Sequence, residues 1–223
     1  SGENVYAIEE DFGKYISHAF RFESNLNSEE EEEEQESISE NSCSELFISE
    51  YVEGNGNNKA IEFYNPTGDY IELDGYTLTR YGNGSTAPSD SAQLWGTVAP
   101  YSTWVLVNGQ TEDFDDGTFI YPACDPILQS LADQLDSDSY PAPTYFNGDD
   151  ALVLTRYGEV IDIFGKVGED PGSAWTDDSE AGFTDYNGGS WLTNNQTLQR
   201  KYDVSEGVTS NPLLFDTFLD WDT

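Results

Sequence analysis

Carboxylates are the side chains with which this chain could do chemistry, because the other reactive types are almost absent. The 223 residues include 44 Asp and Glu, a single histidine at His18 and two cysteines. A Ser-His-Asp triad, a Cys-His pair and a histidine-based zinc or iron site are therefore excluded from the chain beyond His18. Composition leaves open a hydrolase that uses carboxylates alone. Among so many acidic residues, however, close pairs arise by chance, and we expect no enzymatic activity.

Acidic clusters make calcium the one cofactor that the sequence suggests, because Ca²⁺ takes oxygen ligands from flexible loops. The candidate ligands are Asp113, Asp115 and Asp116, then Asp136 and Asp138, and finally Asp177, Asp178 and Glu180. None of these clusters has the glycine and the terminal glutamate of an EF-hand loop. A solvated acidic loop is the simpler interpretation of each cluster.

Tryptophan side chains offer a second kind of site, an exposed platform on which a sugar ring stacks. Trp104 lies in an apolar stretch and is expected to pack in the core. Trp95 and Trp191 are the candidates for such a platform. A surface glycan is accordingly one possible partner.

The net charge of −36 restricts the partners further. Residues 1–42 hold 13 acidic and 2 basic residues, which leaves 31 acidic and 6 basic residues in the remainder. So negative a surface repels phosphate backbones and anionic lipids, and we expect no direct binding of nucleic acid. No apolar run approaches the about 18 residues that span a bilayer, so we expect no membrane insertion. The acidity suits a salt-rich extracellular medium, where screening weakens the self-repulsion.

The chain divides into two parts near residue 43. Residues 1–42 contain the unbroken run Glu29–Glu34, and such blocks of like charge stay extended, so we expect a disordered segment that folding does not require. Residues 43–223 carry the pattern of a folded domain. Its cysteines, Cys43 and Cys124, are compatible with one disulfide or with two buried thiols, and spacing does not distinguish these.

Short strands separated by turn signals fill the second part of the chain, a pattern typical of a β-sandwich or barrel. A nearly continuous apolar run at Thr103–Val107 indicates a central strand, and Tyr157-Gly158 indicates the turn of a hairpin. The predicted strands are Leu46–Val52, Lys59–Tyr64, Tyr70–Leu73, Gly75–Tyr81, Thr103–Val107, Asp149–Arg156, Glu159–Phe164, Thr197–Lys201 and Leu214–Trp221.

A single helix is predicted inside the long segment 108–145. Asp125 is suited to cap it and Pro126 to occupy its first position. Ile127, Leu131 and Leu135 would then share one face. We expect this apolar face to cover an edge or an end of the sandwich.

Several consecutive segments resemble the lamin tail domain family in its bacterial form. The resemblance begins with LFISEYVEG at 46–54, NNKAIEFYN at 57–65 and the L-x-G-Y-x-L strand at 73–78. It continues with FNGDDALVL at 146–154, IDIFG at 161–165, GEDPGSAW at 168–175, TLQRK at 197–201 and DWD at 220–222. It thus extends over about residues 46–223, and it implies that Trp175, at the end of the GEDPGSAW segment, packs in the core.

This resemblance implies an all-β, immunoglobulin-like β-sandwich, with the one short helix in the 108–145 insertion. It implies a non-catalytic structural or interaction module of a secreted or cell-surface bacterial protein, in some cases beside an extracellular enzyme such as a nuclease. A carbohydrate-binding or calcium-dependent adhesion module is the alternative. The acidity, the insertion and the missing coiled coil separate this chain from nuclear lamins, whose nuclear roles are not carried over.

Overall fold

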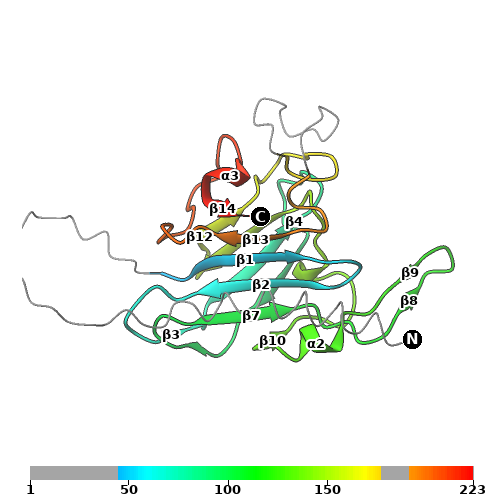
Figure 1. The fold of residues 1–223 in the computed structure, drawn as a ribbon, viewed down its shortest axis with the longest axis horizontal. Coiled ribbons are helices and arrows are strands. Elements are labelled where there is room, and N and C mark those ends of the chain that lie inside the picture. Colours follow the sequence, from blue (N-terminus) through cyan, green and yellow to red (C-terminus); the bar gives the residue numbers. More distant parts are fainter. Residues whose placement is uncertain (1–44, 177–190, 223) are drawn as a thin grey trace, which may run out of the picture. The chain divides into compact units, whose positions relative to one another are not determined.

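Two packed β-sheets form the described part of the computed structural model, residues 45–176 and 191–222 (Figure 1). The predicted N-terminal segment 1–42 lies outside these residues. The six-stranded sheet has the order β10-β7-β2-β1-β13-β14 and the four-stranded sheet the order β12-β11-β4-β5. The predicted all-β, immunoglobulin-like sandwich is confirmed.

The six-stranded sheet is centred on three antiparallel strands, β1 (Phe47–Glu53), β2 (Lys59–Tyr64) and β7 (Thr103–Val107). A register shift between Ile48 and Glu50 introduces a bulge in β1. On one side β13 (Thr197–Arg200) and β14 (Trp221–Asp222) complete the sheet. On the other side β10 (Gln134–Leu135) pairs in parallel with β7. The insertion therefore supplies the edge strand.

The four-stranded sheet consists of β4 (Tyr76–Tyr81), β5 (Asp90–Gln93), β11 (Ala151–Arg156) and β12 (Glu159–Phe164). The hairpin between β11 and β12 turns where it was predicted. Tyr157 and Gly158 have φ angles of 49° and 88°, the left-handed pair that a two-residue hairpin loop requires.

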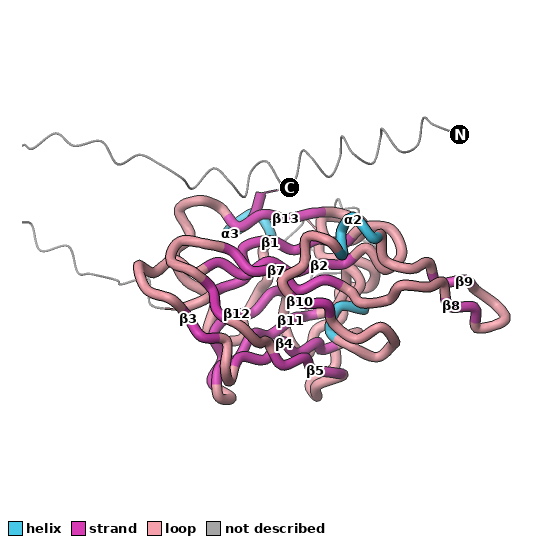
Figure 2. Tube along the Cα trace, turned by 90° about the horizontal axis from the view of Figure 1, so that it is seen from below, coloured by secondary structure: helices cyan, strands magenta, loops and turns pink. Residues whose placement is uncertain are grey.

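Two small ribbons extend from these sheets. The first joins β3 (Ile71–Glu72) to β6 (Thr97–Val98). The second joins β8 (Phe114–Asp115) to β9 (Ile120–Tyr121) and is a hairpin inside the insertion. Figures 1 and 2 both show this hairpin protruding from the sandwich. Neither β5, β6 nor the β8–β9 pair was predicted, because each of these strands has at most four residues and is too short to show an alternating pattern.

Aromatic side chains from both sheets fill the space between them. Phe164 stacks on Tyr51 with ring centroids 4.2 Å apart and meets Trp221 edge-on at 5.2 Å. Trp104 and Trp175 are buried, as predicted. Each fully buried side chain of this size contributes about 1.5–3 kcal/mol through loss of apolar surface to water.

The helix in the insertion is shorter than predicted. Helix α2 (Pro126–Gln129) begins as expected, with the Asp125 carboxylate accepting a hydrogen bond from Ile127 N at 2.8 Å. The predicted apolar face is wrong: Ile127, Leu131 and Leu135 are exposed to 45%, 40% and 47%, and Leu128 is buried instead. The chain leaves the helix after one turn because Gln134 and Leu135 pair with β7. Strand β10, not the helix, covers this edge.

The extended segment predicted at Leu214–Trp221 is also wrong in part. A second short helix, α3 (Thr217–Asp220), occupies its centre, and only Trp221 remains in a strand. The Asp216 carboxylate accepts a hydrogen bond from Phe218 N at 3.0 Å and so caps this helix. A single 3-10 turn, η2 (Pro143–Tyr145), closes the insertion.

Cys124 is a free thiol in the interior, so this cysteine forms no disulfide. Burial raises its pKa to about 11, which keeps the thiol protonated and unreactive at neutral pH. Cys43 lies outside the described residues. The alternatives were one disulfide or two buried thiols, and the structure favours an unpaired thiol at Cys124.

Two acidic residues face each other on the neighbouring strands β1 and β2. Their position predicts how the stability of the fold depends on pH. Glu50 and Glu62 are register partners, and burial, followed by the charge of Glu62, raises the pKa of Glu50 to about 7. A carboxyl whose pKa is raised on folding destabilises the fold as pH rises, here between about 4.5 and 7. We expect Glu50→Gln to raise the free energy of unfolding by about 1–3 kcal/mol at pH 8 and by much less at pH 4.

Urea unfolding at the two pH values measures this difference. The control is Glu159→Gln, on an exposed residue of β12. Equal effects of Glu50→Gln at pH 4 and pH 8 would show that Glu50 ionises normally in the folded protein.

Candidate binding pocket

A cavity of about 880 Å³ lies where the insertion meets the turn between β1 and β2. Its size falls within the range of about 300–1,000 Å³ that is typical of ligand sites. One wall comes from residues 110–121, which include the β8–β9 hairpin, and the facing wall from residues 138–147. Asn57 and Lys59 form the floor. The insertion therefore builds most of this pocket.

The polar groups of the floor are bonded to one another. The Lys59 ammonium donates to Glu53 Oε1 at 2.7 Å and to the Gly54 carbonyl at 3.0 Å. Asn57 Nδ2 donates to Gln110 Oε1 at 3.0 Å. Because the Glu53 carboxylate neutralises Lys59, the floor brings no net positive charge to the pocket.

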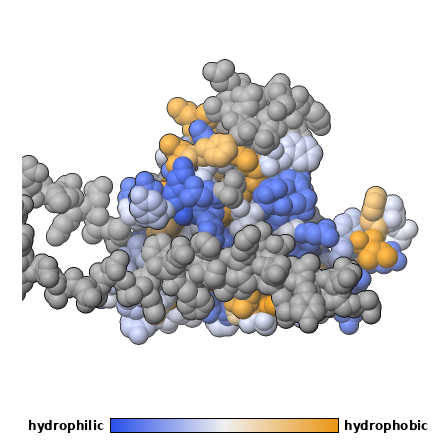
Figure 3. Space-filling view, viewed as in Figure 1, coloured by the Kyte–Doolittle hydropathy of each residue, from blue (hydrophilic) through white to orange (hydrophobic). Residues whose placement is uncertain are grey.

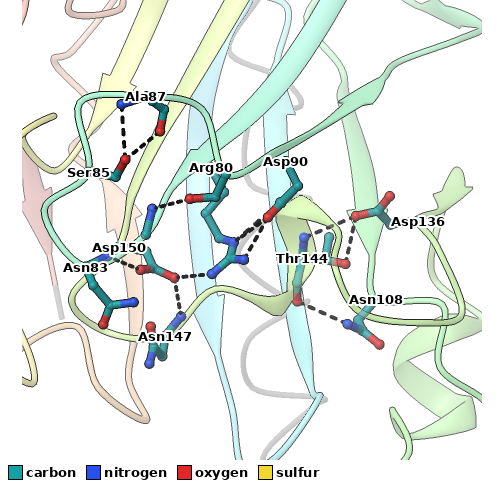
Figure 4. A network of polar contacts seen from close by, with 12 residues as sticks. Arg80, Asn83, Ser85, Ala87, Asp90, Asn108, Asp136, Thr144, Asn147 and Asp150 are labelled. Atoms are coloured by element: carbon teal, nitrogen blue, oxygen red, sulfur yellow. Dashed lines mark hydrogen bonds and ion pairs between the residues drawn. The ribbon is translucent and has the colours of Figure 1, made fainter.

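A second set of bonds attaches the 138–147 wall to the ends of β7 and β10. Thr144 donates through its backbone nitrogen and its hydroxyl to Asp136 Oδ2, at 3.1 and 2.9 Å (Figure 4). Asn108 Nδ2 donates to the Thr144 carbonyl at 3.1 Å. Thr144 is fully buried, so these bonds fix the position of the neighbouring Tyr145.

Aromatic rings stand on both walls. Phe114 and Tyr121 of the hairpin lie with centroids 6.1 Å apart, and Tyr140 meets Tyr145 edge-on at 5.8 Å. Phe114 and Tyr140 are exposed to 60% and 69%. Figure 3 shows apolar side chains gathered at the end of the protruding hairpin. The rings of Phe114 and Tyr140 are therefore accessible to a ligand.

Negative charge surrounds the rings. Glu112, Asp113, Asp116 and Asp138 all line the pocket, and Lys59 is the one basic residue among the lining residues that the structure describes. Burial, followed by the charges of Asp138 and Asp136, raises the pKa of Tyr145 to about 12. The backbone N–H groups of Phe119 and Thr118 lower the pKa of Asp116 and keep it ionised. The pocket is thus acidic as well as aromatic.

Most of the predicted calcium ligands of the first two clusters accept hydrogen bonds from other groups of the insertion. Asp113 accepts from Ala123 N, Asp115 from Gly117 N and Asp116 from Thr118 N and Phe119 N, at 2.7–2.8 Å. Asp138 lines the pocket, and Asp136 binds Thr144. Asp177, Asp178 and Glu180 lie outside the described residues. Within residues 45–176 and 191–222, no three acidic, histidine or cysteine side chains are grouped as a metal site would require.

Calcium binding stays a prediction, and its test separates coordination from screening. A ligand that binds only the folded state raises the melting temperature by mass action. We expect millimolar CaCl₂ to raise the melting temperature above that in NaCl of equal ionic strength if a specific site exists, and calorimetry to show heat of binding. Equal melting temperatures in both salts would leave the acidic clusters as solvated turns.

The predicted sugar-platform residues are both exposed. Trp95 is 61% exposed in the turn after β5, and Trp191 is 48% exposed and forms an isolated bridge with Thr176. Neither lines the pocket. Of the rings that do, Phe114, Tyr121, Tyr140 and Tyr145 were missed. The available signal was the concentration of aromatic and acidic residues within the insertion.

An internal ion-pair network behind the pocket also escaped prediction. Arg80 of β4 donates to Asp150 Oδ2 at 3.0 Å and to Asp90 Oδ2 at 2.7 Å (Figure 4). Its guanidinium lies 5.7 Å from the Tyr140 ring centroid. All three charged residues are buried or nearly so, so the network holds the sandwich and one pocket wall together.

The two packed sheets and the aromatic core between them define an immunoglobulin-like β-sandwich domain. The family model of the lamin tail domain matches residues 39–168, more than half of the chain. The chain belongs to the lamin tail domain family, a family of immunoglobulin-like structural and interaction domains. No curated protein matches the chain. Among the described residues, no helix has the length and apolar character needed to cross a membrane.

Proposed function

We propose that this lamin tail domain is a non-catalytic interaction module of a secreted or cell-surface bacterial protein, where it positions a neighbouring domain or a partner. The observation that carries the proposal is the insertion-built pocket. Its aromatic and acidic walls are exposed, while the sandwich beneath retains a complete core. This arrangement suits an accessory domain of an extracellular enzyme such as a nuclease.

The acidity of the domain supports the extracellular assignment. Screening in a salt-rich medium reduces the repulsion among its carboxylates. Fractionation of the source bacterium with an antibody to the domain tests the assignment. We expect the protein in the medium or at the surface of intact cells, open to added protease. Protein found wholly inside protease-protected cells would refute it.

The non-catalytic role is tested by assays of nuclease and glycosidase activity on the full chain, with and without divalent cations. We expect no turnover above that of the buffer. We also expect no mobility shift of duplex DNA at physiological salt, because the surface charge opposes the approach of phosphates. A shift only with calcium would indicate that the cation bridges the two.

A carbohydrate-binding or calcium-dependent adhesion module is the second candidate, because both Trp95 and Trp191 are exposed. A glycan array with and without a calcium chelator tests it. Trp95→Ala and Trp191→Ala would abolish binding if these rings stack on sugar. Tyr202→Ala, at an aromatic residue exposed to 87%, is the control.

A further inference from the structure

The walls of the pocket combine two features that recognise the same kind of group. An aromatic face attracts a cation through its quadrupole when the cation lies within about 6 Å of the ring centroid. A carboxylate attracts the same cation through its charge. Phe114 and Tyr121 stand on one wall, Tyr140 and Tyr145 on the other, and Glu112 and Asp138 lie beside them.

One contact between a guanidinium group and a ring of the pocket is already present in the structure. The Arg80 guanidinium lies 5.7 Å from the Tyr140 ring centroid, although Arg80 does not itself line the pocket. Tyr140 is therefore a ring that accepts a guanidinium in this fold. The contact also helps to fix the ring at the pocket wall, which lowers the entropy lost on binding.

Two of the carboxylates that line the pocket are available to bind a ligand. Within residues 45–176 and 191–222, no hydrogen bond involves the carboxylate of Glu112 or of Asp138, and both residues are exposed. Asp113 and Asp116, by contrast, accept bonds from backbone nitrogens of their own hairpin. The single positive group of the lining, Lys59, is buried and paired with Glu53.

We propose that the pocket between the β8–β9 hairpin and residues 138–147 binds a basic side chain, arginine above all, of a protein partner. The inference rests on the proposed interaction function and names the chemistry of the partner. A neutral sugar would stack on the rings and donate hydroxyl hydrogen bonds to the carboxylates, but only a cationic group also gains from their net negative charge, and an anionic ligand would be repelled. The volume of about 880 Å³ exceeds what one side chain needs, so the segment that carries the arginine also enters.

Calorimetric titration of the full chain with two blocked peptides tests this. The probes are Gly-Arg-Gly-Arg-Gly and the same peptide with citrulline in place of arginine, which keeps the shape and removes the charge. We expect the arginine peptide to bind at physiological salt and the citrulline peptide to bind at least about tenfold more weakly. Equal affinities would overturn the proposal.

Paired variants separate the pocket from the general acidity of the chain. The double variant Glu112→Gln, Asp138→Asn should weaken the arginine peptide about tenfold, and Phe114→Leu about threefold or more. The matched controls are Asp203→Asn, Glu206→Gln and Phe218→Leu, all at exposed residues that do not line the pocket. We expect these controls to change affinity less than twofold. Equal losses in both sets would mean diffuse attraction and would overturn the proposal.

Circular dichroism and melting temperatures accompany each variant, so that a folding defect is not read as lost binding. A neutral oligosaccharide that binds in a Phe114-dependent manner, with no binding of the arginine peptide, would assign the pocket to sugar. Failure of the arginine peptide alone refutes only this inference. The extracellular and non-catalytic proposal depends on fractionation and activity assays, which this experiment does not affect.

Discussion

Replacing Asp162 with Asn is expected to lower the free energy of unfolding by about 3–5 kcal/mol, because one buried carboxylate serves four donors. Asp162 has no exposed surface. Its Oδ1 accepts from Ile163 N, Val208 N and Arg200 Nη2, and its Oδ2 accepts from Ile48 N at 2.9 Å. An Asn amide nitrogen would place a donor against one of these donors. Arg200 would also lose its buried ion-pair partner.

Equilibrium urea unfolding followed by tryptophan fluorescence measures this loss. Asp203→Asn, which removes the same charge from an exposed position, should change the free energy by less than about 0.5 kcal/mol. Adding Arg200→Met to Asp162→Asn should recover part of the loss, because the unpaired guanidinium is removed. A loss below about 1 kcal/mol for Asp162→Asn alone would show that water or a shifted backbone replaces these bonds.

Much of the sandwich could be predicted because its determinants are local. The apolar run of β7, the alternation in β2 and the Tyr157-Gly158 turn each depend on residues close in sequence. The cap of α2 is local as well: Asp125 and Pro126 specify where the helix begins. Its end is not local, because residues 134–135 leave the helical pattern to pair with β7. That competition between a helix and a strand edge cannot be read from spacing alone.

The charged interior and the pocket depend on partners far apart in the sequence. Asp162 joins Ile48 across 114 positions, and Arg80 joins Asp150 across 70. In an alternating strand an Asp is read as solvent-facing, so Asp162 gave no sign of burial. The two pocket walls meet only because the insertion folds back over the β1–β2 turn. Its acidic residues were noticed as calcium ligands, whereas the rings beside them were not connected to a site.

Adjacent aspartates at the start of β11 are expected to have opposite effects on stability. Asp150 is buried and accepts from Arg80 Nη1 at 3.0 Å, Asn83 N at 3.0 Å and Asn147 N at 3.2 Å (Figure 4). Asp150→Asn should therefore lower the free energy of unfolding by about 2–4 kcal/mol. The loss is smaller than at Asp162 because Arg80 keeps its second partner, Asp90.

The ionised form of the Asp149 side chain is disfavoured in the folded protein. Burial, followed by the charge of Asp150, raises its pKa to about 6. Since the folded pKa exceeds the unfolded value of 3.8, its ionisation costs stability as pH rises between about 4 and 6. Asp149→Asn should thus be neutral at pH 4 and stabilising by up to about 2 kcal/mol at pH 8.

Urea unfolding of both variants at pH 4 and pH 8 distinguishes the two roles. Only Asp150→Asn should also loosen the pocket wall, because Arg80 contacts the Tyr140 ring. Its effect on binding of the arginine peptide should exceed that of Asp149→Asn, measured where both variants are fully folded. If both substitutions destabilise equally at pH 8, the difference in hydrogen bonding between the two carboxylates does not control their energetics.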